Sequence, residues 1–306
     1  MPTVNTAQAI GPIVSIGLPV HNGGESLARA LDSILAQTYT NFQLVISDNA
    51  STDRTAEICL EYSRRDSRIR YFRQPKNIGA TANFRYVLES STQLRFIWAA
   101  ADDWWDQNRL ELLVAELHEQ DAAVVGTIKR WSGETAFAEF KPIAFHQGEW
   151  WHYFMREESR CEKVYYIYGL LWRDSAIKAL ASAQDRYCDD AFFCYQLLWG
   201  GNLRSVDGAT LNVSASLTSS GGLAAESFRY SFTRLAYKAH PWSFYKGYYL
   251  STPSHARPRL VSAIPLKALC SQLHLWFRAF RRVILKRPYV HGALPGGENV
   301  VRNSGL

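Results

Sequence analysis

Short apolar runs alternate with amphipathic helical segments from Ile13 to about Thr127, and this alternation constrains the fold more than any other feature. The runs are rich in β-branched residues, as expected of buried strands, and they cover residues 13–18, 42–47, 69–72, 96–99 and 123–126. Apolar residues recur at helical spacing between them, in residues 25–37, 51–62, 77–88 and 107–119. This pattern predicts an α/β fold whose mostly parallel sheet carries helices on both faces.

Charged and polar residues stand shortly after three of the predicted strands. His21 follows the first strand, Asp48 follows the second, and the pair Asp102 and Asp103 comes after the strand that ends at Ala99. The carboxyl ends of parallel strands meet at one edge of a sheet, where open α/β folds bind their ligands. These residues therefore predict a ligand site at that edge.

The alternation weakens near residue 128, and aromatic residues become more frequent there. Residues 165–172 predict an apolar strand pair or a turn. A helix is expected to begin at Asp189 and Asp190 and to end at Gly200. The chain therefore divides into residues 1–127, residues 128–226 and a helical extension of residues 227–306.

The extension is strongly basic. Residues 227–297 contain twelve Lys or Arg residues and no Asp or Glu, whereas the remainder of the chain carries 22 basic against 28 acidic residues. Such a segment is expected to meet an anionic partner. Its apolar residues fall at steps of three or four and form a stripe of Leu266, Leu269, Leu273, Trp276, Phe280 and Ile284.

Two interpretations of this apolar stripe are open. In the first, the extension is a peripheral helix that contacts an anionic membrane. In the second, the helix packs its stripe on the rest of the protein and leaves its arginines in solvent. Within residues 227–306, no uncharged stretch approaches the roughly 20 residues that a membrane-spanning helix needs.

The cysteines and the start of the chain bear on its cellular location. Five widely spaced cysteines without a Cys-x-x-Cys pair favour free thiols in a reducing compartment over disulfides or a zinc site. The first twelve residues show no basic segment followed by an apolar one, so no secretory signal is predicted. We expect a cytoplasmic protein, placed at the inner face of the membrane if its extension binds lipid.

Several motifs occur together in order: VSIGLPVHN at 14–22, LDSILAQT at 31–38, VISDNASTD at 45–53, Asn77-x-Gly79, and Asp102-Asp103-Trp104-Trp105. In these motifs the chain resembles family 2 glycosyltransferases of the GT-A fold. Such enzymes move a sugar from a nucleotide diphosphate to an acceptor hydroxyl with inversion. The resemblance makes residues 1–127 the nucleotide-sugar-binding half of the GT-A domain and residues 128–226 its acceptor-binding half.

The resemblance assigns six residues to the nucleotide: Pro19, Val20, His21, Glu25, Asp48 and Asn77. Asp48 would accept a hydrogen bond from the base. A carboxylate that only accepts hydrogen bonds suits the imide N–H of uracil or thymine, so a UDP- or dTDP-sugar is the expected donor. Asp53 is either a further nucleotide contact or the residue that starts the following helix.

Asp102 and Asp103 correspond to the metal motif of the family. Relatives often carry Asp-x-Asp-Asp, and Ala100 stands here in place of the first acid. Mg²⁺ and Mn²⁺ need hard oxygen ligands, and one or two carboxylates suffice when phosphates and water fill the other positions. The resemblance therefore implies Mg²⁺ or Mn²⁺ at Asp102, with Asp103 as a second ligand, a ribose contact or a support of the motif.

Asp189 and Asp190 stand where the family commonly carries its catalytic base. An acceptor hydroxyl needs a group that takes its proton, and we assign this role to Asp190 ahead of Asp189. Two carboxylates at the start of a helix are also an ordinary cap that interacts with the helix dipole. The candidates for stacking on an acceptor sugar are Trp104, Trp105, Trp150 and Trp151.

The sequence thus predicts a glycosyltransferase that acts on a glycan or a lipid-linked saccharide with the help of a divalent metal. One alternative is a catalytically inactive protein of the same fold that only binds nucleotide-sugars, which the missing acid at Ala100 motivates. A nucleic-acid binder that uses the basic extension is a weaker alternative, because no recognised binding motif accompanies the charge. A nucleic-acid partner is therefore not expected.

Overall fold

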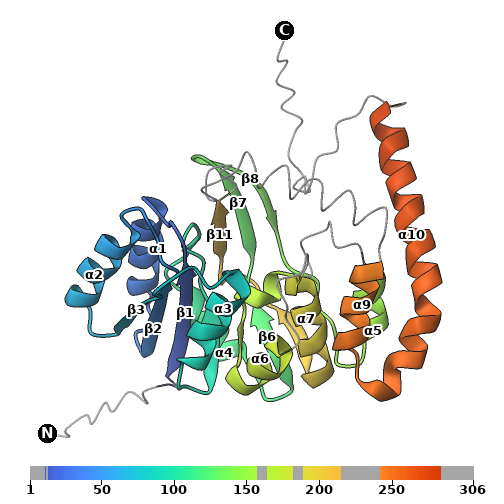
Figure 1. Cartoon of the computed structure of the whole chain (residues 1–306), viewed down its shortest axis with the longest axis horizontal. Coiled ribbons are helices and arrows are strands. Elements are labelled where there is room, and N and C mark those ends of the chain that lie inside the picture. Colours follow the sequence, from blue (N-terminus) through green and yellow to red (C-terminus); the bar gives the residue numbers. More distant parts are fainter. Residues whose placement is uncertain (1–10, 12, 157–163, 182–188, 215–241, 284–306) are drawn as a thin grey trace, which may run out of the picture.

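The computed structural model describes residue 11 and residues 13–156, 164–181, 189–214 and 242–283. Figure 1 shows a large central sheet with helices around it, a smaller sheet that rises beside it, and a long helix at the outer edge of the molecule. This arrangement is the α/β class that the sequence predicts.

The first part of the chain alternates strands and helices as predicted. Its strands in the large sheet are β1 (Val14–Val20), β2 (Phe42–Asp48), β3 (Ile69–Arg73), β4 (Arg95–Trp98) and β6 (Asp121–Val125). Its helices are α1 (Ser26–Leu35), α2 (Thr55–Arg65), α3 (Ala80–Glu89) and α4 (Arg109–Glu116). β1 pairs in parallel with β2, from Val14 opposite Phe42 to Val20 opposite Asp48, so the loops after these two strands start side by side.

The large sheet has the strand order β10-β6-β9-β4-β1-β2-β3. Two of these strands come from the second half of the chain, namely β9 (Leu170–Trp172) and β10 (Asn202–Ser205). β10 runs parallel to β6, whereas β9 is antiparallel to both β4 and β6, so the sheet is mostly parallel, as predicted. β9 has three residues and follows the 3₁₀ turn η2 (Tyr165–Tyr168). A strand this short shows no periodicity, so the sequence left open whether residues 165–172 form a strand pair or a turn.

The smaller sheet was not predicted from the sequence. It has the order β5-β11-β7-β8 and consists of β5 (Trp104–Trp105), β7 (Ile128–Ser132), β8 (Thr135–Phe140) and β11 (Leu211–Ser214). Both halves of the chain contribute to both sheets, because β5 precedes residue 128 while β9 and β10 follow it. The division at residues 127 and 128 therefore stays a functional proposal and does not separate two folding units.

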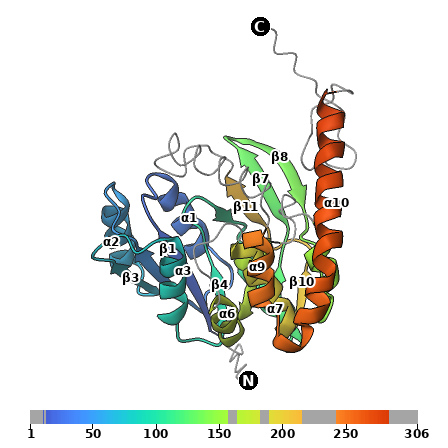
Figure 2. The same ribbon diagram turned by 45° about the vertical axis from the view of Figure 1, so that its right-hand side comes forward.

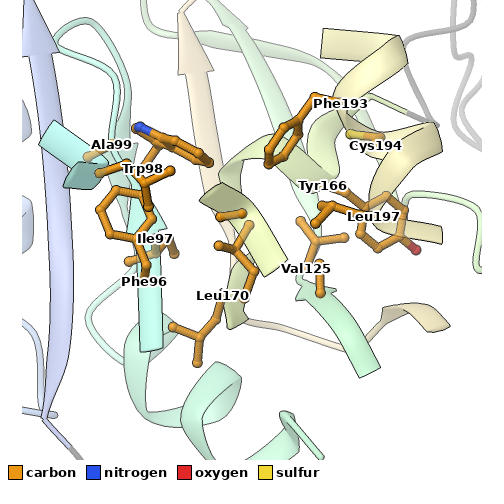
Figure 3. Packing of buried hydrophobic residues seen from close by; sticks show 14 of the residues in the cluster. Phe96, Ile97, Trp98, Ala99, Val125, Tyr166, Leu170, Phe193, Cys194 and Leu197 are labelled. Carbon is orange, nitrogen blue, oxygen red and sulfur yellow. The ribbon is translucent and has the colours of Figure 1, made fainter. Parts of the chain in front are cut away.

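Aromatic packing in the core connects β4 with α7 (Asp189–Gly200). Trp98 on β4 has no exposed surface, and its ring packs edge-on against Phe96 and Phe193, with centroids 4.7 Å and 5.4 Å away. Figure 3 shows Phe193 of α7 pointing towards Trp98. Since Phe193 lies one turn into α7 and Asp102 follows shortly after Trp98, this contact holds the start of α7 near the end of β4.

The remaining helices lie on the side of the molecule away from β3. They are α5 (Trp150–Met155), α6 (Arg173–Leu180), α9 (Trp242–Ser251), the 3₁₀ turn η3 (Ser254–Ala256) and α10 (Arg257–Val283). Figures 1 and 2 both show α10 at the outer edge, and α9 packs against it. The described part of the basic extension is therefore helical, as predicted. Within the described residues, no helix is long and apolar enough to cross a membrane.

Candidate active site

The loop after β1 is joined to the loop after β2 by hydrogen bonds. Asn22 N–H donates to Ser51 Oγ (2.9 Å), and Asn22 Oδ1 accepts from Thr52 N–H (2.9 Å). Gly24 N–H donates to Asp53 Oδ2 (2.9 Å). Asn22 and Gly24 both have positive φ, of 52° and 50°, which Asn and Gly tolerate better than other residues. The two loops therefore form one preorganised surface at the carboxyl edge of the sheet.

Asp53 connects this surface to the start of α2. Its Oδ1 accepts from Thr55 N–H (3.0 Å) and from Thr55 Oγ1 (2.5 Å), while its other oxygen holds Gly24. Thr55 is the first residue of α2, whose first backbone N–H groups have no partner within the helix. Asp53 thus binds the first residue of α2, as one of its two interpretations predicts, and a contact between Asp53 and the nucleotide stays a prediction.

Asp48, the predicted base contact, has no exposed surface. Its Oδ1 accepts from Ser51 N–H (2.8 Å), and its Oδ2 accepts from the Tyr71 hydroxyl (3.0 Å). Arg73 Nε lies 3.8 Å from the same Oδ2. In this arrangement Asp48 holds the loop after β2 in place, and a ligand reaches its carboxylate only if the loop moves. The contact between Asp48 and a base stays a prediction.

Asn49, which follows Asp48 in the motif but received no role in the sequence analysis, contributes to the site. Its Nδ2 donates to Asn77 Oδ1 (2.9 Å), and its Oδ1 accepts from Ile78 N–H (2.8 Å). Asn77 Nδ2 in turn lies 3.3 Å from His21 Nε2. Asn49 thus holds Asn77, and Asn77 lies next to His21, so the structure brings these two predicted residues together. The sequence signal for Asn49 was its position next to Asp48 in the motif.

The other three predicted nucleotide residues lie around the same surface. Pro19 and Val20 are buried at the end of β1, beneath the loop that carries His21. Glu25 is exposed at the start of α1. Pro19 and Val20 therefore form the floor of the surface, and Glu25 lies at its rim.

Asp102 and Asp103 differ in how far they are exposed. Asp103 is 6% exposed, and its Oδ1 accepts from Ser214 N–H of β11 (3.1 Å), so it ties the loop after β4 to the smaller sheet. Asp102 is partly exposed. Its hard carboxylate oxygens fit a divalent ion such as Mg²⁺ or Mn²⁺.

The metal site that Asp102 can form is sparse. Among the residues that the structure describes, no group of three or more His, Cys, Asp or Glu side chains could hold a metal ion. A divalent ion at Asp102 would therefore take most of its ligands from diphosphate and water, which is the usual coordination of Mg²⁺ in proteins.

Arg109 on α4 occupies the protein interior next to the acidic pair and has no exposed surface. Its guanidinium donates to the carbonyl oxygens of Tyr168 (2.7 Å) and Ala209. Burial lowers the pKa of Arg109 to about 9, an effect that the charges of Asp103 and Asp106 oppose. Arg109 thus supplies a counter-charge for the buried Asp103 and the exposed Asp106, and its hydrogen bonds join α4 to η2 and to the segment before β11.

The pKa of Tyr168 responds both to the charges of the acidic pair and to the charge of Asp190, the predicted base. Burial raises the pKa of its hydroxyl well above the usual value, and the negative charges of Asp103, Asp102 and Asp190 raise it further. Asp190 lies in the first turn of α7, where its Oδ1 accepts from the next backbone N–H (2.8 Å). One tyrosine is therefore in electrostatic range of all three carboxylates, although they come from distant parts of the sequence. The side chain of Asp189 lies outside the described side chains.

The burial of Asp103 has a consequence for stability against pH. Burial, followed by the charge of Asp102, raises the pKa of Asp103 to about 7, whereas the value in an unfolded chain is about 3.9. The folded state therefore binds more protons than the unfolded state between these two values. We expect the free energy of unfolding to fall by about 2 to 4 kcal/mol as the pH rises through this window.

Urea unfolding in the presence of a chelator, between about pH 4.5 and about pH 7.5, measures this pH dependence. The Asp103→Asn variant is the matched control, because an amide oxygen can still accept from Ser214 N–H but does not titrate. We expect the variant to show a flatter profile than the unchanged protein. Equal slopes for the two proteins would contradict the raised pKa.

A pair of tryptophans lies beside the acidic pair. The Trp104 ring on β5 has the guanidinium carbon of Arg29 3.8 Å from its centroid, and the Trp131 ring on β7 lies 5.6 Å away. Trp131 Nε1 donates to Asn212 Oδ1 (2.9 Å), and both tryptophans keep part of their surface exposed. The sequence analysis missed Trp131, because only the pairing of β7 with β11, which in turn pairs with β5, brings it to this position.

Three other tryptophans were predicted to face an acceptor sugar. Trp105 is only 4% exposed, and Trp150 stacks on Trp199 with centroids 6.3 Å apart. Trp105 belongs to the hydrophobic core and cannot face an acceptor sugar in this structure, whereas Trp150 is partly exposed and its role stays a prediction. Trp151 is exposed on α5 and packs edge-on against Trp150.

Comparison with known proteins places the chain in a family. A profile of glycosyl transferase family 2 matches residues 15–169, slightly more than half of the chain. The chain is 31% identical over 173 residues to glycosyltransferase GlyA and 32% identical over 114 residues to glycosyltransferase GlyG, both from Streptococcus pneumoniae serotype 4. These alignments span 55% and 37% of this chain but only 23% and 38% of the two relatives. The chain belongs to glycosyl transferase family 2.

Solved structures share the fold. S. aureus TarS 1–349 matches with a TM-score of 0.55 and 14% identity, over 83% of this chain and 87% of that one. The mannosyltransferase PcManGT from Pyrobaculum calidifontis, in complex with GDP-Man and Mn²⁺, matches with a TM-score of 0.55 and 14% identity, over 90% of this chain and 82% of that one. The fold is accordingly that of GT-A glycosyltransferases, as the sequence predicts.

Proposed function

We propose that this chain transfers a sugar from a UDP- or dTDP-sugar to a hydroxyl of a glycan or a lipid-linked saccharide, with inversion and with a divalent metal ion. The observation that carries this proposal is the packing of Phe193 in α7 against Trp98 in β4, which holds the start of α7, with Asp190, near the end of the strand that Asp102 and Asp103 follow. The charges of these three carboxylates all raise the pKa of Tyr168. Membership of the family and the likeness to a structure that holds a nucleotide-sugar and Mn²⁺ support it.

The nucleotide would lie on the surface that the loops after β1 and β2 form. His21 and Asn77 would line the base and ribose site, with Pro19 and Val20 as its floor and Glu25 at its rim. Each carboxylate oxygen accepts more than one hydrogen bond. Asp48 can therefore hold its loop and still receive the imide N–H of uracil or thymine, once the loop opens to admit the base.

The transfer needs a base and a good leaving group. Asp190 would take the proton of the acceptor hydroxyl while that oxygen forms a bond to the anomeric carbon of the donor sugar. The bond from the anomeric carbon to the diphosphate oxygen breaks, and the diphosphate leaves with the electron pair from the opposite face. A divalent ion held by Asp102, with Asp103 supporting the motif or adding an oxygen, would neutralise charge on the diphosphate.

The acceptor sugar would stack on Trp104 and Trp131. The C–H face of a sugar is apolar enough to cover an aromatic ring, and the hydrogen bond from Trp131 to Asn212 holds that ring in a defined orientation. Both rings stand close in the fold to the acidic pair, since β5 begins directly after Asp103. This position suits the acceptor side of the site.

Nucleotide binding with Mn²⁺ is the test of the donor site. We expect UDP or dTDP to raise the melting temperature of the protein in Mn²⁺, and GDP and ADP to raise it less. A free nucleotide concentration of about 100 times Kd corresponds to about 2.7 kcal/mol of added stability. The Asp102→Asn variant should lose the Mn²⁺-dependent part of this shift. Glu134→Gln, which changes an exposed carboxylate in the turn between β7 and β8, should keep it.

The absence of any nucleoside diphosphate effect, with or without Mn²⁺, would overturn the proposal. A metal-independent shift without sugar transfer to any acceptor in a broad panel would favour the second candidate function, a nucleotide-sugar-binding protein without catalysis. Ala100 and the sparse metal site of the described residues are the observations that favour this second candidate.

A further inference from the structure

One face of α10 attaches the helix to the rest of the protein. Leu260 and Ala263 are buried, and Lys267 is only 1% exposed. The Lys267 ammonium donates to the carbonyl oxygen of Arg156 at the end of α5 (2.6 Å) and lies 5.8 Å from the ring centroid of Phe154. At 3.6 residues per turn the three buried residues of α10 lie within about 60° of one another around the helix. They therefore determine which face of α10 points outward.

The outward face of α10 exposes three large apolar side chains, beside the exposed polar residues Arg259 and Ser262. Val261, Leu266 and Leu269 are 50%, 46% and 56% exposed. Around the helix, Leu266 and Leu269 lie about 100° and 160° from Lys267 in one direction, and Val261 lies about 120° from it in the other. Leu266 and Leu269 belong to the apolar stripe of the sequence, so for these two residues the interpretation in which the stripe packs on the rest of the protein is wrong. The other four members of the stripe lie outside the described side chains.

Exposed apolar residues are concentrated in this part of the molecule. Among the described residues, half of the ten large hydrophobic side chains that are exposed belong to α9 and α10: Tyr249, Leu250, Val261, Leu266 and Leu269. Figure 1 places these two helices at the right-hand side of the molecule, and Figures 1 and 2 both show α10 at the outer edge. Exposed apolar residues concentrated in this way indicate a surface that binds a membrane or another molecule.

We propose that the outer face of α10 docks on an anionic lipid surface. Residues 227–297 contain twelve basic residues and no acidic ones. Lys267 is buried, whereas Lys246 of α9 and Arg259 of α10 are exposed. A second copy docked through the same face would bring two basic segments together without an acidic partner in either. An anionic bilayer supplies both an apolar phase for the leucines and the counter-charge.

α10 would lie parallel to the membrane surface, because the described part of the helix exposes apolar side chains on one face and is attached to the protein by the other. Membrane docking would place the catalytic domain at a lipid surface, where a lipid-linked acceptor is found. The docking itself does not depend on the proposed catalytic activity, since none of its residues belongs to the candidate active site.

Co-sedimentation of the full chain with vesicles tests the proposal. We expect pelleting with phosphatidylcholine vesicles that contain about one third phosphatidylglycerol, and little pelleting with phosphatidylcholine alone. The double variant Leu266→Asn, Leu269→Asn should partition about tenfold more weakly onto the anionic vesicles. Leu94→Asn is the matched control, because Leu94 is 74% exposed in the segment before β4, and it should pellet like the unchanged protein.

Two outcomes would overturn the proposal. The first is equal pelleting of the double variant and the unchanged protein. The second is a dimer in light scattering that the double variant dissociates, which would show that a second copy covers this face. Circular dichroism of the variants confirms that they are folded. Because vesicle binding is measured without donor or acceptor, its failure and a failure of sugar transfer are separate results.

Discussion

The Asp190→Asn variant is expected to lower kcat by about 10²- to 10⁴-fold, while the affinity for the nucleotide changes little. An amide cannot take the proton of the acceptor hydroxyl, but it keeps the size of the carboxylate and can still accept the hydrogen bond from the next backbone N–H. Release of the nucleoside diphosphate in the presence of acceptor measures kcat. Calorimetry with the nucleotide alone measures the affinity.

A matched control separates catalysis from helix capping. Asp174 lies in the first turn of α6, as Asp190 does in α7, and its side chain is 78% exposed. Asp174→Asn therefore removes a charge near a helix N-terminus without touching the site, and it should leave kcat unchanged. Asp189→Asn tests the neighbouring acid. A large loss in Asp189→Asn with normal turnover in Asp190→Asn would move the role of the base to Asp189, and normal turnover in both variants would contradict the proposed mechanism.

Replacing Arg109 by Met is expected to lower the free energy of unfolding by about 3 to 5 kcal/mol. The substitution removes a buried cation while its neighbours stay in place. The carbonyl oxygens of Tyr168 and Ala209 lose their hydrogen-bond donor, and Asp103 and Asp106 lose a counter-charge. Urea unfolding followed by tryptophan fluorescence measures the change.

Two further variants show whether the position of Arg109 matters. Arg54→Met changes an arginine whose side chain is 77% exposed and whose ion pair with Glu57 lies at the surface, so stability should not change measurably. Arg109→Lys keeps a charge but loses the planar fork that reaches two carbonyl groups, and it should fall between the unchanged protein and Arg109→Met. Stability of Arg109→Met equal to that of the unchanged protein would contradict the role that we assign to this residue.

The large sheet was predictable because its signals are local. β1 is buried along its whole length, and the sequence from Val14 to Val20 shows this directly as an uncharged, mainly apolar run. The smaller sheet lacked such a signal, since β5 has two residues and pairs with β11, which lies about a hundred residues further along the chain. Pairing between distant short strands depends on the folded arrangement and leaves no period in the sequence.

The candidate site also contains residues that the sequence could assign and residues that it could not. His21 and the pair Asp102 and Asp103 could be assigned because they follow predicted strands, and parallel strands end at one edge. The role of Asn49 in joining the loops could not be assigned, because its partner Asn77 lies in another loop. Trp131 and Arg109 likewise depend on contacts across the two sheets.

The sequence by itself determined the parallel sheet, the edge at which its polar residues gather, and the apolar stripe of the basic extension. These properties follow from local periodicity and from the ends of the strands. Only the tertiary structure decided that the charges of Asp190 and of the acidic pair all raise the pKa of Tyr168, and that α10 turns Lys267 inward and Leu266 and Leu269 outward. A helical stripe defines two faces of a helix. Which face is buried depends on the groups of the neighbouring elements, here the carbonyl oxygen at the end of α5.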